Sequence, residues 1–184
     1  MKNKAKEIDL LNESDRGAVI VAAALLEDDL TEILKKMVQR NGLSAKYVNE
    51  MFDLSGPLSS FSSKALICYG FGIISEEIFN DLTKIRKLRN KFAHSSDKVD
   101  FLSSEIEDHV AEIQCCVEAS KSFVGELFKG RGKNNLADQA KSTTLEDWEL
   151  RAKGFVKYTK SVFCFGVLRL RIKIKEHQLL SRKT

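Results

Sequence analysis

Helix-breaking residues are scarce in this sequence of 184 residues, which holds one proline and ten glycines. A fold of many short strands needs both residues at its turns, so their scarcity disfavours a β-sandwich and favours long helices. No apolar run reaches the roughly 20 residues that a membrane-spanning helix requires. The basic N-terminus leads into no apolar segment, which argues against a secretory signal and predicts a cytoplasmic protein.

Metal-binding and catalytic motifs are also missing. The four cysteines, at positions 68, 115, 116 and 164, form no CxxC pair, and the three histidines lie far apart. Adjacent cysteines make a poor tetrahedral clamp, so we expect no metal and no cofactor. The sequence has no GxGxxG, P-loop, HExxH or GxSxG motif. Without an export signal, the cysteines are expected to be small buried hydrophobic residues.

Apolar residues recur at helical spacing along most of the chain, which predicts an all-α fold, a bundle of about five to seven helices. Ser14 or Asp15 can cap the first helix, which Asn41 and Gly42 end. A helix or turn over residues 44–54, a helix from Ser59 or Ser60 and a helix after Ser75 follow. Ser104 and Glu107 open another, which continues to Leu127. The predicted core includes Val19, Leu26, Leu30, Ile33, Leu82, Ile85, Leu88, Ile113 and Val117.

The sequence suggests three parts: a core helical bundle over residues 1–130, a linker over 131–143, and a C-terminal helix over 144–184. The linker prediction rests on the Gly-Arg-Gly-Lys-Asn-Asn run at 130–135. The last helix is expected to pack on the bundle and to end in a basic tail. Residues 167–175 alternate apolar and basic side chains, as in a strand, but no partner strand is visible, so we predict a helix.

Charge is distributed unevenly along the chain. Residues 151–184 hold ten Lys or Arg and one Glu, a net charge of +9. Because the whole chain has a net charge of +4, residues 1–150 have a net charge of −5. One interpretation is weak, non-specific contact of the basic tail with nucleic acid, or contact with an acidic partner. The other is a solvated helix face. No helix-turn-helix is evident to read DNA sequence.

A polar constellation lies on the helix predicted after Ser75. At about 100° per residue, Arg89 points from the middle of the apolar face, and Arg86, Asn90 and His94 form one row along its flank. Arginine and asparagine can hold a phosphodiester while histidine moves a proton. In the structural alternative, Arg89 pairs with a buried acid of the first helix (Glu27, Asp28 or Asp29) and His94 is a helix-end cation.

Several segments resemble the mannitol operon repressor (MtlR) family. They are residues 14–17 (Ser-Asp-Arg-Gly) with the helix after them, 56–62 (Gly-Pro-Leu-Ser-Ser-Phe-Ser), 66–74 (Leu-Ile-Cys-Tyr-Gly-Phe-Gly-Ile-Ile) and 77–94. Together they cover roughly residues 10–128, and the last helix fits more loosely. The resemblance implies an all-helical regulator of transcription without a recognised DNA-binding motif.

A second resemblance is local. Residues 89–94 (Arg-Asn-Lys-Phe-Ala-His) are similar to the R-x4-H motif of HEPN domains, with Arg89, Asn90 and His94 matching position by position. HEPN domains are helical bundles that often dimerise and in many members cleave RNA. This resemblance implies a homodimer and, as an alternative function, a metal-independent ribonuclease using Arg89 and His94.

The leading hypothesis is therefore a non-enzymatic regulator of a sugar-alcohol operon that acts through contacts with a protein partner. Its binding residues are expected to be Arg86, Arg89, Asn90 and His94.

Overall fold

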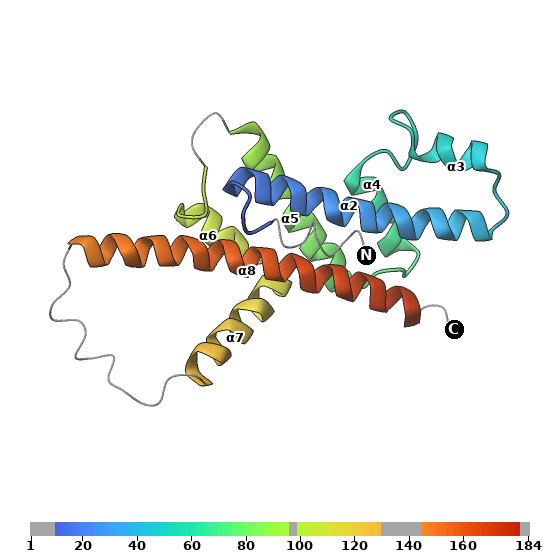
Figure 1. Cartoon of the computed structure of the whole chain (residues 1–184). Helices are drawn as coiled ribbons and strands as arrows, with labels where there is room; N and C mark the ends of the chain where they lie inside the picture. Colours follow the sequence, from blue (N-terminus) through green and yellow to red (C-terminus); the bar gives the residue numbers. More distant parts are fainter. Residues whose placement is uncertain (1–9, 96–98, 130–144, 181–184) are drawn as a thin grey trace.

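Every secondary-structure element that the computed structural model describes is a helix, which confirms the all-α prediction (Figure 1). The structure describes residues 10–95, 99–129 and 145–180, with side chains for 10–95, 99–122 and 158–177. The helices, in chain order, are α2 (Asp15–Arg40), α3 (Ala45–Phe52), α4 (Phe61–Gly70), α5 (Glu76–His94), α6 (Ser104–Ala111), α7 (Gln114–Lys129) and α8 (Leu145–Leu180).

Serine side chains cap four of the described helices, and three of these caps, on α2, α4 and α5, agree with the sequence prediction. Ser14 accepts a hydrogen bond from the backbone N–H of Gly17 at 3.0 Å. Ser60 and Ser75, the caps of α4 and α5, each accept a hydrogen bond from the backbone N–H three residues further along the chain. Each serine satisfies one backbone donor that the first helical turn leaves unpaired. At the end of α2, Gly42 takes the left-handed conformation with φ 77°, a conformation open to glycine because it has no Cβ.

The single helix predicted from Ser104 to Leu127 is wrong, because the chain turns between α6 and α7. Ser103, rather than Ser104, caps α6. The carboxylate of Asp81 on α5 accepts hydrogen bonds from the backbone N–H groups of Gln114 at 2.7 Å and Cys115 at 2.9 Å. These bonds cap a new helix. The carboxylate that caps the start of α7 thus comes from α5. The apolar residues between 106 and 117 keep their helical spacing, so they do not reveal that the helix is interrupted.

Helices α2 and α8 run side by side in the same direction (Figure 1). Near the start of α2, Asp15 pairs with Lys160 at 3.4 Å, and about three to four turns further along, Asp29 pairs with Arg171. Helices α5 and α4 pack on α2 as well, and α7 packs on α8. A single helix, α2, therefore contacts most of the bundle.

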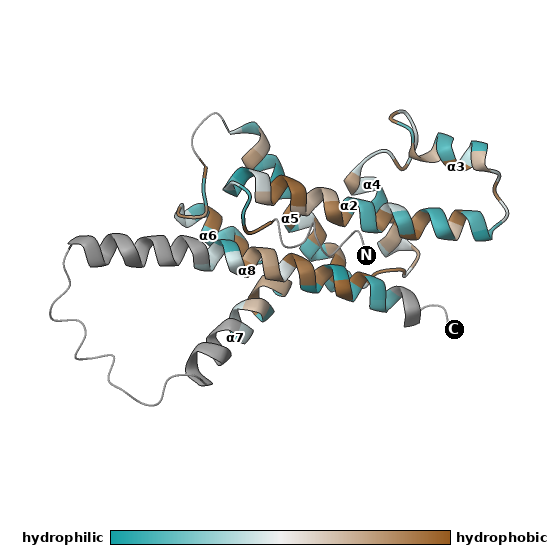
Figure 2. Ribbon diagram, viewed as in Figure 1, coloured by the Kyte–Doolittle hydropathy of each residue, from teal (hydrophilic) through white to brown (hydrophobic). Residues whose placement is uncertain are grey.

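The hydrophobic core lies where α2, α4, α5 and α8 face one another, and Figure 2 shows apolar residues gathered on these facing sides. The rings of Phe92 and Phe163 each lie 5.6 Å from the ring of Phe101. Eight of the nine predicted core residues are buried. The exception is Val117, which is half-buried and lines a cavity.

All four cysteines are free and buried, so the prediction that they act as small hydrophobic residues is confirmed. Burial raises the pKa of Cys68 to about 12 and that of Cys164 to about 11. The pKa of Cys115 is raised as well, by the hydrogen bond of Cys115 with Cys116 and by burial. These three thiols are protonated near neutral pH and are poor nucleophiles.

Residues 167–175 are helical within α8, as predicted, and their apolar members explain the strand-like pattern. Val167, Leu170 and Ile174 are buried in the core at helical spacing, whereas Ile172 is exposed. The predicted linker over 131–143 lies outside the described residues. None of the helices in the described ranges is long and apolar enough to cross a membrane.

Gly166 sets how closely α8 approaches α7. A Cβ atom at this position would lie 2.6 Å from Cys116 Sγ and 3.0 Å from the backbone of Cys116. Gly166→Val should force the two helices apart and lower the free energy of unfolding by about 1–3 kcal/mol. Gly70→Ala is the matched control, since nothing lies within 4 Å of its Cβ. Urea denaturation measures both, and equal stability of the two variants would contradict the close approach.

Candidate protein-interaction surface

The basic residues of α8 contact acids of the bundle. Lys173 pairs with Glu77 of α5 at 2.7 Å and with Glu118 of α7 at 2.8 Å, and Arg169 reaches Glu118 at 3.2 Å. The hydrogen bond from Lys173 holds the pKa of Glu118 below its ordinary value. Neither interpretation of the charge asymmetry anticipated these contacts. Much of the positive charge of α8 is matched by the negative charge of the body.

Arg171 makes the deepest of these contacts. Its Nε and Nη2 atoms donate to the two carboxylate oxygens of Asp29 at 2.5 and 3.0 Å, and both residues are buried. The structural alternative for Arg89 is therefore wrong. Asp29 is taken by Arg171, Glu27 pairs with Lys64 at 2.7 Å, and Asp28 is exposed. A sequence cannot show which of several arginines reaches a buried acid.

All four predicted binding residues belong to α5, with Arg86, Asn90 and His94 in one row along its flank and Arg89 nearer the apolar face. Arg86, Arg89 and Asn90 are half-buried, and His94 is exposed at the end of the helix. Within the described part of the chain, none of the four side chains makes a hydrogen bond or an ion pair. Arg89 and His94 differ by about 140° around the helix axis, so α5 does not by itself point them at one spot. Arg86 also lines a groove.

That groove lies between α4 and α5 and has a volume of about 250 Å³. Phe61, Ala65 and Leu66 form its α4 side, and Phe79, Thr83 and Arg86 are among its residues from α5. No acidic residue lines it. The groove therefore combines apolar side chains with the uncharged polar groups of Ser62, Asn80 and Thr83 and one guanidinium, which suits a partner that presents an apolar side chain beside a negative charge.

Large apolar side chains are also exposed on α4 and at its C-terminal cap, Phe71. Leu66 is 58% exposed and Phe71 is 72% exposed. The ring of Tyr69 stacks on that of Phe79, with centroids 4.8 Å apart and planes at 14°. We call Leu66, Tyr69, Phe71, Phe79 and Arg86 the α4–α5 surface. Contiguous exposed apolar side chains of this kind mark interaction sites in soluble proteins.

Sequence reasoning placed Leu66 and Tyr69 in a helix without recognising that they face outward. The signal was present, because α4 is apolar on more than one face. Phe61, Ala65 and Cys68 suffice to bury its inner side. A surface helix normally carries polar residues on the opposite side, so the extra apolar residues indicated a partner.

Both the sequence and the fold of this chain are similar to those of known proteins. The mannitol repressor (MtlR) family model matches residues 8–151. Mannitol operon repressors of Escherichia coli K12 and of Escherichia coli O6:H1 are each 26% identical over 101 residues, which is 54% of this chain and 52% of theirs. The chain therefore spans about half the length of the curated relatives it matches.

A solved structure resembles the fold over nearly its whole length. It is a chain from the X-ray structure of the MtlR–HPr complex of Escherichia coli, with a TM-score of 0.67 and 20% sequence identity. The match covers 92% of this chain and 98% of that one. At this identity the likeness concerns the fold. Because the family model covers more than half of the sequence, the chain belongs to the mannitol repressor family.

Proposed function

We propose that this protein regulates transcription of a mannitol or related sugar-alcohol operon in the cytoplasm, and that it acts through a protein partner held at the α4–α5 surface. The observation that carries the proposal is the exposed run of Leu66, Tyr69 and Phe71 beside an acid-free groove. Aromatic residues and arginine supply most of the binding energy in protein interfaces. The partner we propose is an HPr-type phosphocarrier, because the structural neighbour was solved in complex with HPr.

Direct reading of DNA is the weaker explanation of regulation. Arg169, Arg171 and Lys173 of α8 are held by acids of the body, so this helix offers nucleic acid much less free charge than its composition suggests. We propose that contact with nucleic acid is weak, independent of sequence and steeply reduced by salt.

A reporter assay tests the regulatory proposal. The chromosomal gene is deleted, and the parent protein, Leu66→Asp or Leu54→Asp is supplied in its place while expression of the neighbouring sugar-alcohol operon is measured. Leu54 is the matched control, because it is fully exposed in the segment between α3 and α4. The parent and Leu54→Asp should restore repression, and Leu66→Asp should not. Full repression by Leu66→Asp would refute a role for this surface.

A ribonuclease remains the second candidate, and one observation favours it. Arg89 has no acidic partner in the described structure, so its guanidinium is available to a phosphate. Because Arg89 and His94 point in different directions from α5, we propose that this candidate requires a homodimer in which both copies contribute. Incubation of the protein with total RNA, beside Arg89→Ala and His94→Ala, tests it. Cleavage by the parent that both variants lose would establish the catalytic alternative.

The stability of Arg89→Ala shows whether Arg89 forms a buried ion pair that stabilises the fold. Because no ion pair is lost, the free energy of unfolding should fall by no more than about 1 kcal/mol, mostly from the packing of the alkyl stem. Lys87→Ala, on the exposed side of α5, is the control. Thermal unfolding of both variants measures the effect. A loss of about 3–5 kcal/mol in Arg89→Ala alone would mean that Arg89 has a buried charged partner.

A further inference from the structure

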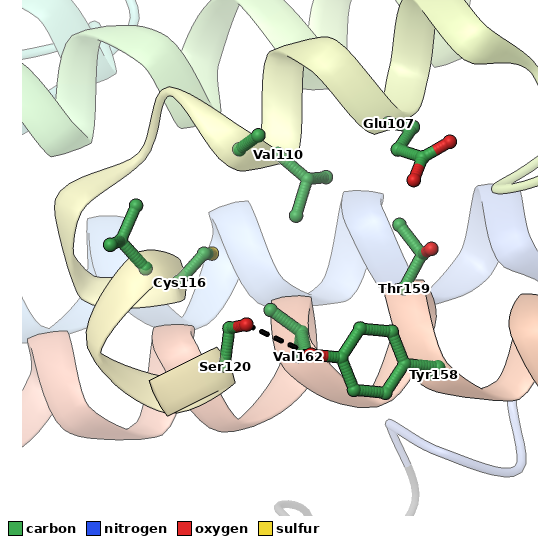
Figure 3. Close-up of a pocket in the computed structure, with 9 residues that line it drawn as sticks. Glu107, Val110, Cys116, Ser120, Tyr158, Thr159 and Val162 are labelled. Atoms are coloured by element: carbon green, nitrogen blue, oxygen red, sulfur yellow. Dashed lines mark hydrogen bonds between the residues drawn. The ribbon is translucent and has the colours of Figure 1, made fainter. Parts of the chain in front are cut away.

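A second cavity lies away from the α4–α5 surface, between α6, α7 and α8 (Figure 3). Its volume is about 230 Å³, and its walls are mostly apolar, with Val110, Val117 and Val162 among them. Glu107 and Thr159 lie at one end and Cys116 at the other (Figure 3). The cavity shares no residue with the α4–α5 surface.

Two features of the backbone create the space. The chain turns between α6 and α7, so α7 leaves the line of α6 instead of continuing it. Near Cys116, α7 lies close to α8 because Gly166 has no side chain, and from there α7 diverges from α8 (Figure 1). The wedge between the diverging helices begins at Cys116, which is one of the residues lining the cavity.

The polar groups of the cavity differ in what they already bind. The hydroxyl groups of Ser120 and Tyr158 are 2.8 Å apart and hydrogen-bonded to each other (Figure 3). Glu107 is half-buried, and its carboxylate makes neither a hydrogen bond nor an ion pair with any of the described residues. A carboxylate beside an apolar cavity favours a cation there, because the low-dielectric walls strengthen the attraction.

We propose that this cavity binds a small amphipathic amine, with its apolar body between Val110, Val117 and Val162 and its ammonium group at Glu107. The size fits, since an apolar cavity of about 150 Å³ is known to hold benzene in another protein. A polyhydroxylated molecule such as a sugar alcohol does not fit these walls, because most of its hydroxyl groups would lose water without gaining a partner. The site is separate from the α4–α5 surface and does not rest on the function proposed for it.

Benzylamine is the probe for this site, and titration followed by two-dimensional ¹H–¹⁵N NMR is the measurement. Saturable shifts should appear at residues of α6 and α7 around the cavity. Benzyl alcohol should bind at least tenfold more weakly, and mannitol should produce no saturable shift. The same results in Leu66→Asp would show that the cavity works independently of the α4–α5 surface.

Two substitutions make the test decisive. Glu107→Gln, at a half-exposed position, should keep the fold and weaken benzylamine binding at least tenfold. Val117→Phe should fill the cavity from a half-buried position and abolish binding, with circular dichroism confirming that the variant is folded. Absence of saturable binding to the parent would overturn the proposal. Binding that neither substitution weakens would overturn it too, since the amine would then be held elsewhere.

Discussion

Asp29→Ala should lower the free energy of unfolding by about 3–5 kcal/mol, because it leaves the buried guanidinium of Arg171 without its carboxylate. The pair joins α2 to α8 in the core, where water cannot replace the lost partner. A chemical denaturation curve should show a lower midpoint with a similar slope. For a domain of this size, the loss is a large fraction of the whole stability.

Asp28→Ala is the matched control for Asp29→Ala. Asp28 is the preceding residue of the same helix and is exposed, so its replacement should change stability by less than about 0.5 kcal/mol. Replacing both partners, as Asp29→Leu with Arg171→Met, should recover much of the loss, since apolar residues of similar size remove the buried charge. Asp29→Ala as stable as Asp28→Ala would show that the buried pair does not form.

Asp81→Ala should cost about 2–4 kcal/mol, because two backbone N–H groups at the start of α7 lose a charged acceptor in a buried place. Asp81 is 1% exposed, so water cannot take over the hydrogen bonds. Hydrogen exchange should show faster exchange of the amides of Gln114 and Cys115 than in the parent protein. Asp81→Asn should be intermediate, since an amide oxygen still accepts.

Asp108→Ala serves as the comparison for Asp81→Ala. Asp108 is an exposed acid of α6, and its removal should change stability by less than about 0.5 kcal/mol. If Asp81→Ala and Asp108→Ala unfolded at the same denaturant concentration, the capping role of Asp81 in starting α7 would be wrong.

Local signals in the sequence were enough to predict most of the helices. A serine cap, an apolar stripe and a glycine end are all read within a few residues, and Ser14, Ser60 and Ser75 each cap the expected helix. The break between α6 and α7 could not be predicted, because Asp81 lies 33 residues before the first amide it caps. Such a break depends on a contact with a residue far away in the sequence, and the spacing of apolar residues does not identify that residue.

The candidate site shows the same division. Helical geometry correctly placed Arg86 on a flank of α5, and the structure adds the α4 residues that make a groove beside it. The pairing of Asp29 with Arg171 could not be predicted, since three acids on α2 and many cations were equally suitable by type. Because Asp29 pairs with Arg171, it is not the acidic partner expected for Arg89. The same pair neutralises a positive charge of α8 that was expected to be available to nucleic acid.

The most direct test of the central claim is a calorimetric titration of the protein with the HPr-type phosphocarrier of the same cell. The parent protein and Leu54→Asp should bind with the same affinity. Leu66→Asp should bind at least tenfold more weakly, a loss of about 1.4 kcal/mol or more, because a carboxylate would replace an apolar contact in the α4–α5 surface. Equal affinity of all three proteins, or no binding by the parent, would contradict the account.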